Sequence, residues 1–178
     1  MMATYRTVLR QLAADNDGYL TPRMAEEAGV PAVELRKLAS RGAFERKLRG
    51  VYREPLYPAD ALDPLRELLL SLGEETYLAE DTVLALHGLA DVNPRNVYVA
   101  SPLRHQRELP ENVTIVKARE GARVTYVDGL PCQHVSDALR AVRGKLMRER
   151  FDEAVEEARL EGLIRMHDYE SLKFDEGA

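Results

Sequence analysis

The 178-residue sequence contains few of the residues on which metal and disulfide chemistry depends. Its single cysteine, Cys132, excludes an internal disulfide and a zinc site built from several cysteines, and it fits a reducing compartment. The four histidines do not occur at metal-binding spacing, and only His134 lies close to the cysteine. A structural role is the simpler interpretation of both residues, so we expect neither a metal nor a cofactor.

Motifs of common enzymes are missing as well. The sequence has no Gly-rich phosphate-binding loop and no G-x-S-x-G nucleophile motif. Residues Glu45–Lys47 match the E-x-K fragment of restriction-type nucleases, but no suitably placed Pro-Asp precedes them. A metal-dependent nuclease is therefore a distant alternative, and we expect a protein without enzymatic activity.

No apolar run is long enough for a membrane span. The longest candidate, around Leu65–Leu72, contains Arg66 and Glu67 and falls short of the roughly 18 residues that a span requires. The first residues lack the apolar core of a secretion signal. With 45% hydrophobic and 31% charged residues, the composition is that of an ordinary folded protein. We expect a soluble, cytoplasmic protein without a membrane partner.

Charge is distributed unevenly along the chain. Residues 1–58 carry ten Lys and Arg against seven Asp and Glu, whereas residues 59–178 carry 15 against 23. Within residues 36–53, seven basic residues accompany one acidic residue. Such asymmetry indicates different partners for the two parts, although a solvated basic face would give the same count. Pro55 and Pro58 form a stiff connector, so we predict one domain at 1–58 and another at 59–178.

The first segment carries the signals of three short helices. Apolar residues at helical spacing predict a helix over Tyr5–Asp15. Thr21 followed by Pro22 is typical of the start of a second helix, because threonine caps and proline suits the first helical position. Pro31 and Gly42 mark the beginning and the end of a third.

A β-hairpin is predicted after these helices. Strands at Phe44–Leu48 and Val51–Arg53 flank a tight turn, and the order of elements is typical of a winged helix-turn-helix. In that fold Leu35 and Leu38 pack inward, the polar face of the third helix meets a DNA groove, and the hairpin, or wing, reaches phosphates. A helical interaction module with a basic surface is the alternative. The candidate DNA-binding residues are Thr21, Arg23, Arg36, Lys37, Ser40, Arg41, Arg46, Lys47 and Arg49.

The second segment predicts a smaller mixed domain. Helices are expected over Asp63–Leu72 and Glu80–His87, from a Ser136 cap to Val142, and over Leu146–Leu160; strands are expected over Asn96–Ala100, Val113–Lys117 and Val124–Val127. The fold class is therefore α+β, with an N-terminal winged helix-turn-helix followed by a small mixed α/β C-terminal domain. Ten acidic and four basic residues in 149–176 indicate a solubilising helix face or, alternatively, a docking surface for a basic protein.

Short motifs also occur in a characteristic order along the chain. They are Gly18-Tyr19-Leu20-Thr21, Ala28-Gly29-Val30, Leu35-Arg36-Lys37-Leu38, Arg41-Gly42, the stretch Phe44–Arg53 followed by Pro55, Asp81–Leu89 ending in His-Gly-Leu, Asn96-Val97-Tyr98-Val99, and Gly129-Leu130-Pro131 leading to Ser136–Leu139. Together they resemble the AbiEi family of antitoxins from type IV toxin–antitoxin systems, over about residues 5–165. One departure is Val135-Ser136-Asp137, where the family often has Thr-Ile-Asp.

The resemblance implies an antitoxin that binds double-stranded operator DNA through its N-terminal domain and represses its own operon. The C-terminal domain would be the antitoxin part, and the partner would be a cognate AbiEii-type nucleotidyltransferase toxin, countered without a stable complex being required. The toxin's own signature, Gly-Ser followed by spaced aspartates, is absent from the sequence, so the chain is not expected to be the toxin. The alternative is a stand-alone winged-helix transcriptional regulator whose C-terminal domain senses a ligand or dimerises.

Overall fold

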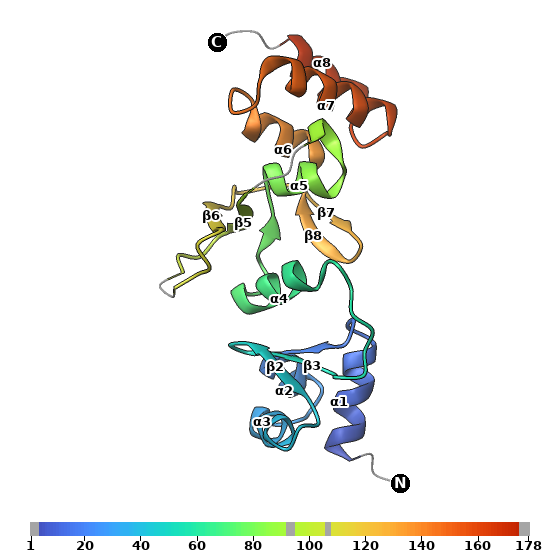
Figure 1. Ribbon diagram of the computed structural model, residues 1–178, viewed down its shortest axis with the longest axis vertical. Coiled ribbons are helices and arrows are strands. Elements are labelled where there is room, and N and C mark those ends of the chain that lie inside the picture. Colours follow the sequence, from blue (N-terminus) through green and yellow to red (C-terminus); the bar gives the residue numbers. More distant parts are fainter. Residues whose placement is uncertain (1–3, 92–94, 106–107, 175–178) are drawn as a thin grey trace. The chain divides into compact units, whose positions relative to one another are not determined.

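The computed structural model describes residues 4–91, 95–105 and 108–174, and the chain divides into two compact units. Unit 1 comprises Met1–Glu74 and unit 2 comprises Glu75–Ala178 (Figure 1). Among the described residues, no helix has both the length and the hydropathy needed to cross a bilayer. Each unit has its own core, so the two are described separately.

Unit 1 begins with the elements of the predicted winged helix-turn-helix. They are α1 (Tyr5–Ala14), β1 (Tyr19–Leu20), α2 (Pro22–Glu27), α3 (Ala32–Ser40), β2 (Glu45–Leu48) and β3 (Val51–Arg53). The strands form an antiparallel sheet in the order β1-β3-β2, in which Leu20 pairs with Tyr52 and Arg46 also pairs with Tyr52. The hairpin β2–β3 is thus the wing, and β1 joins it to the helices. The predicted fold class is confirmed.

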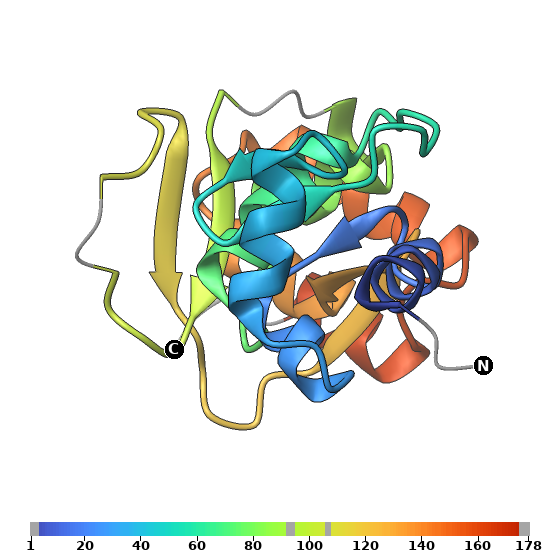
Figure 2. The same ribbon diagram turned by 90° about the horizontal axis from the view of Figure 1, so that it is seen from below.

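The core of unit 1 is built from the inward faces of its three short helices. Leu9, Ala13, Ala25 and Leu35 are completely buried, and Leu38 packs against the same cluster. The inward position predicted for Leu35 and Leu38 is therefore correct. Figure 2, which views α1 nearly end-on and α3 from the side, shows how the helices cross around this core. Because α3 uses its apolar stripe for packing, its opposite face is left to solvent.

A fourth helix, α4 (Asp63–Leu72), completes unit 1. It packs against β2 and β3, and it buries Leu68, Leu69 and Leu72. The chain therefore divides later than the domain boundary expected after Pro58, because the apolar face of α4 requires cover and the wing strands provide it. Residues 59–74 add one arginine and four carboxylates, so unit 1 carries eleven residues of each sign.

Gly18 shows how closely the connector approaches the turn before β1. Its φ is +84°, and a Cβ atom built there would lie 2.5 Å from Cγ of Tyr57. Gly42, with φ +79°, has no atom within 4 Å of such a Cβ. We expect Gly42→Ala to lower the free energy of unfolding by about 1 kcal/mol through backbone strain alone. Gly18→Ala should cost about 3 kcal/mol, because overpacking adds to the strain.

Urea denaturation of the two glycine variants measures this difference directly. Equal losses of stability would show that Tyr57 moves aside freely and that the connector is not packed on this turn.

Unit 2 contains a five-stranded mixed sheet. Its strands are β4 (Tyr77–Leu78), β5 (Val97–Ser101), β6 (Val113–Lys117), β7 (Val124–Val127) and β8 (Leu130–Gln133), in the order β6-β5-β4-β8-β7. The β4–β8 and β5–β6 pairs are parallel, whereas β4–β5 and β7–β8 are antiparallel. The strands predicted near residues 97, 113 and 124 are present, whereas residue patterns alone predicted neither β4 nor β8.

The helices of unit 2 are α5 (Asp81–Leu86), the 3-10 turn η1 (Leu89–Asp91), α6 (Val135–Val142), α7 (Arg148–Leu160) and α8 (Met166–Phe174). His87 forms the C-cap of α5, as expected. The predicted Ser136 cap is wrong: His134 caps α6 with its side chain, and Ser136 lies completely buried in the first turn. Helix α8 was not predicted.

Candidate nucleic-acid interface

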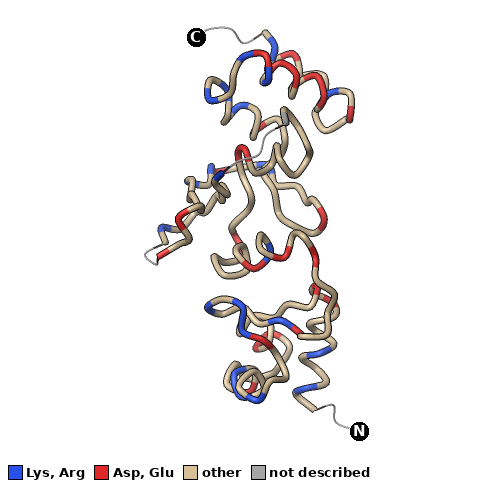
Figure 3. The backbone as a smooth tube through the Cα atoms, viewed as in Figure 1, with Lys and Arg blue, Asp and Glu red and all other residues tan. Residues whose placement is uncertain are grey.

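The outer face of α3 carries the basic residues that the sequence assigns to DNA. Arg36, Lys37 and Ser40 of α3 and its C-cap Arg41 are exposed, while Leu35, next to Arg36, is buried (Figure 3 shows Lys and Arg along α3 and the wing). Lys37 Nζ lies 2.8 Å from Glu34 Oε1 one turn earlier. The Ser40 hydroxyl donates to the Lys37 carbonyl at 2.8 Å. Lys37 and Ser40 are therefore already bonded within α3, whereas the guanidinium groups of the two arginines have no ion-pair partner among the described residues.

The wing presents a second group of cations. All four residues of β2 are exposed, and the turn between the strands places Gly50 at φ +77°. Arg46 and Arg49 lie on this hairpin and are exposed. Within residues 4–91, 95–105 and 108–174, neither arginine forms an ion pair, and the same is true of Arg36 and Arg41. Four exposed, unpaired guanidinium groups thus belong to α3 and the wing, where contacts to phosphate and base edges are made in this fold.

Two predicted site residues have structural partners in α2. The Thr21 hydroxyl accepts a hydrogen bond from the Met24 N–H at 3.2 Å and so caps the helix. Arg23 makes two ion pairs, at 2.8 Å each, with Glu27 and with Glu74. Both Arg23 partners are carboxylates of unit 1, so its charge is already neutralised. The structure therefore does not group Thr21 and Arg23 with the four unpaired arginines.

Arg53, counted in the basic run of the sequence, points away from solvent. Its guanidinium donates to the Pro58 carbonyl at 2.7 Å and to Asp63 Oδ2 at 3.1 Å, and it lies 5.6 Å from the Tyr19 ring centroid. Burial raises the pKa of Asp63, but the Asp60 N–H and the Arg53 charge outweigh burial, so the pKa falls below its ordinary value. Asp63 is thus a fixed anion that ties α4 to β3.

Lys47 differs from the other wing cations because two carboxylates lie near it. Its Nζ is 4.0 Å from Glu45 Oε2 and 3.9 Å from Glu67 Oε1. Glu67, on α4, also accepts a 2.9 Å hydrogen bond from the Tyr19 hydroxyl. Burial, this hydrogen bond and the Glu67 charge all raise the pKa of Tyr19, so the phenol stays a donor. Sequence patterns gave no signal for Glu67, since its partners are 48 and 20 positions away.

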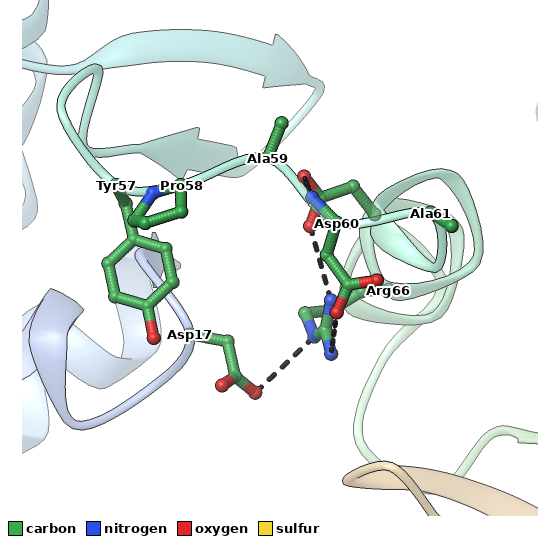
Figure 4. Close-up of a pocket in the computed structure, with 8 residues that line it drawn as sticks. Asp17, Tyr57, Pro58, Ala59, Asp60, Ala61 and Arg66 are labelled. Atoms are coloured by element: carbon green, nitrogen blue, oxygen red, sulfur yellow. Dashed lines mark hydrogen bonds and ion pairs between the residues drawn. The ribbon is translucent and has the colours of Figure 1, made fainter.

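A cavity of about 680 Å³ opens beside the connector of unit 1 (Figure 4). Asp17, Asp60 and Asp63 line it together with Arg66. Arg66 lies 3.4 Å from Asp17, 3.8 Å from Asp60 and 3.2 Å from Asp63. Because the central arginine is bonded to all three carboxylates, the cavity is a structural junction between the connector, α4 and the turn before β1.

Unit 2 contains a partly buried ionic network centred on Asp168. Asp168 of α8 lies 3.4 Å from Arg123 and 2.9 Å from Arg140, and Arg123 also donates to the buried Ser136 hydroxyl at 2.6 Å. Burial raises the pKa of Asp168, but hydrogen bonds from Arg140 and Arg123 outweigh it and lower the pKa to about 2. The network fastens α8 to α6 and to the start of β7.

Cys132 and His134 lie in the same region, and each has a structural role. Cys132 is completely buried, and burial raises the pKa of its thiol to about 11, so it is neither an exposed nucleophile nor a thiolate. Burial and the Arg123 charge lower the pKa of His134, which leaves its Nδ1 free to accept the Ser136 N–H. Among the described residues, no group of three or more His, Cys, Asp and Glu is placed to hold a metal ion.

Three acidic residues of α7 are bonded to other residues of unit 2. Glu156 accepts from the Tyr169 hydroxyl and lies 3.2 Å from Arg159. Glu157 accepts the Ala90 N–H at 3.3 Å, and Asp152 lies 3.7 Å from Lys173. These contacts favour a structural use of the acidic face over a docking surface for a basic protein.

The elements of unit 1 define a winged helix-turn-helix with an exposed basic face, a class of fold found in transcriptional regulators. Residues 8–55 match the model of a protein family described as transcriptional regulator, AbiEi antitoxin. The match runs from α1 through β3 to Pro55, so the part of the chain that is similar to this family is its N-terminal region. The resemblance seen in the sequence is confirmed for that region and stays a prediction for later residues.

No curated protein matches the sequence. Among solved structures, the RV2827C protein from Mycobacterium tuberculosis resembles the chain with a TM-score of 0.45 and 18% sequence identity, over 97% of this chain and 72% of that protein.

Proposed function

We propose that the protein is an antitoxin and autorepressor that binds double-stranded operator DNA through unit 1. The observation that carries the DNA-binding part is the set of four exposed, unpaired arginines on α3 and the wing. Unit 1 has no net charge, yet three of its carboxylates, Asp60, Asp63 and Glu74, are paired with Arg66, Arg53 and Arg23. Unpaired positive charge therefore remains on α3 and on the wing.

The proposed mechanism assigns different tasks to the two elements. Helix α3 enters the major groove, where Arg36 and Arg41 donate to guanine edges, with Lys37 and Ser40 beside them. The wing residues Arg46 and Arg49 bind phosphates or an adjacent minor groove. Repression follows because a protein bound at the operator of its own operon excludes the transcription machinery.

The test of this reading is the affinity of the full chain for duplex DNA from upstream of its own gene. Arg36→Ala or Arg41→Ala should cost about 1–3 kcal/mol at a base-reading position and relax the preference there. Fluorescence anisotropy with single-base operator variants separates this effect from a phosphate contact, whose loss weakens all sequences alike. If neither substitution alters sequence preference, recognition lies in the wing or in DNA shape.

The antitoxin part of the proposal rests on the family match of residues 8–55. We assign the protein to a type IV system, with an AbiEii-type nucleotidyltransferase as the toxin that it counters without forming a stable complex. The experiment is growth of cells in which the cognate toxin is expressed from a foreign promoter, with and without the full chain. Growth should be restored only when the chain is present.

The second candidate function is a stand-alone winged-helix regulator whose unit 2 senses a ligand or dimerises. The restriction of the family match to residues 8–55 favours it, since unit 2 contributes nothing to that match. Operator binding without rescue from the toxin would make this the leading function.

A further inference from the structure

Lys47 has a different environment from the two arginines that flank the tip of the wing. Its ammonium group lies between Glu45 on its own strand and Glu67 on α4, at 4.0 and 3.9 Å. The Lys47 side chain is 34% exposed, and Glu67 is 16% exposed. Arg46 and Arg49 have no such neighbour among the residues that the structure describes. Of the three wing cations proposed for DNA, Lys47 alone faces a carboxylate from outside the helix-turn-helix.

Glu67 is the rigid member of this pair. Its Oε1 accepts from the hydroxyl of Tyr19, which is only 1% exposed and lies in the same sheet as the two wing strands. Helix α4 is itself fixed by the ion pair between Asp63 and the buried Arg53. Lys47, in contrast, is a point charge on a flexible four-carbon chain that can turn toward solvent. The distances of 3.9 and 4.0 Å are long for an ion pair, so the lysine is weakly held.

We propose that Glu67 is an intramolecular competitor with DNA phosphate for Lys47. This inference rests on the proposed DNA-binding function of unit 1. In the free protein the Lys47 ammonium remains beside α4, and on operator DNA it exchanges the Glu67 carboxylate for a phosphate. The free energy needed to break the internal pair therefore offsets part of the free energy gained from the phosphate contact. Helix α4, which lies outside the helix-turn-helix, thereby sets the affinity of the wing for DNA.

The substitution Glu67→Gln tests the proposal with little structural disturbance, because the glutamine carbonyl still accepts from the Tyr19 hydroxyl. The full chain carrying it should bind the upstream duplex about two- to fivefold more tightly, the range expected for an exposed ion pair. Lys47→Gln should weaken binding in the wild-type chain, and it should weaken binding more in the Glu67→Gln chain, where no internal pair offsets the phosphate contact. The dependence of log affinity on log salt should steepen by up to about one unit in Glu67→Gln.

The matched control is the same Glu67→Gln change in a chain that already carries Lys47→Gln. The gain in affinity should disappear there, because no lysine remains to be released. An equal gain in both backgrounds would show a long-range effect of net charge and overturn the proposal. Unchanged or weaker binding by Glu67→Gln, with the melting temperature preserved, would also overturn it. Lys47→Gln alone tests the same coupling without altering α4. If it lowers the affinity for the duplex as much as Arg46→Gln does, the competition is contradicted.

Failure of this inference can be told apart from failure of the proposed function. A wild-type chain that binds the upstream duplex, combined with no coupling between Lys47 and Glu67, rejects only the competition. A wild-type chain that binds no duplex at any salt concentration rejects both.

Discussion

A full chain carrying Arg46→Glu, Lys47→Glu and Arg49→Glu should lose all measurable binding to its operator. The proposed function places these three cations on phosphates and the substitutions make them anions, so favourable counterion release is replaced by repulsion at the same positions. We expect a loss of at least about a hundredfold at physiological salt. The fold should persist, because the β2 residues and Arg49 are exposed and the core of unit 1 contains none of the three. Gel-shift titration with the upstream duplex measures the change.

The control for net charge is a second triple reversal, Arg95→Glu, Arg104→Glu and Arg165→Glu. These arginines of unit 2 are exposed and form no ion pair among the described residues. The two triple variants have the same total charge, so a comparable loss of affinity in both would remove the assignment of the wing as the DNA contact.

The wing variant also separates the two activities in the proposed function. If protection against the toxin is independent of repression, the variant should still restore growth when the toxin is expressed from a foreign promoter. Rescue that disappears together with DNA binding would show that protection comes from repression, and the stand-alone regulator would then be the better description.

Asp168→Asn should destabilise unit 2 by about 2 kcal/mol near neutral pH. The pKa of Asp168 is lowered from 3.8 to about 2, and each unit of such a shift corresponds to about 1.4 kcal/mol. The side chain is only 8% exposed, so solvent screens the interaction little. The asparagine would leave Arg123 and Arg140 with Asp137 as their remaining carboxylate partner. Thermal unfolding at pH 7 gives the magnitude.

The pH dependence of stability provides a second measurement of the same network. A carboxyl group with a lowered pKa stabilises the folded state fully above its unfolded pKa of about 4. That contribution is lost as the pH falls through about 2. Wild type and Asp168→Asn should therefore differ in stability at pH 5–7 and converge near pH 2. Asp152→Asn is the control, since the ion pairs of Asp152 with described residues are long, at 3.9 and 3.7 Å, and its own side chain is exposed, so stability should change by less than about 0.5 kcal/mol.

The helices and strands of unit 1 could be predicted because local signals mark each boundary. Thr21 before Pro22 begins α2, and glycines with positive φ follow α2 and α3. The strand β8 lacks such a signal, because it is four residues long and contains Pro131, which is disfavoured inside a sheet. Helix α8 could not be predicted from periodicity, since it has no apolar stripe and buries only Asp168 and Leu172.

The positions of Lys and Arg in the sequence identified the candidate interface, but the sequence could not show which of these cations form ion pairs within the protein. Arg53 and Arg36 look alike in a count of charges, yet Arg53 is buried against Asp63 and Arg36 is exposed. The decisive contacts join residues far apart in the chain, as in Tyr19 and Glu67. For the same reason the sequence placed the domain boundary at the prolines and did not show that α4 covers the wing.

The parallel pairing of β4 with β8 has a consequence for the order in which the two units form during synthesis. Leu78 pairs with Cys132, so the central strands of unit 2 cannot meet until the segment between them has been made. At about 5–20 residues per second, that segment takes several seconds on the ribosome. The strands of unit 1 pair within residues 19–53 and need no such delay. A nascent chain therefore acquires its winged helix before its second sheet, and any activity of unit 2 begins only on a molecule whose helix-turn-helix has already formed.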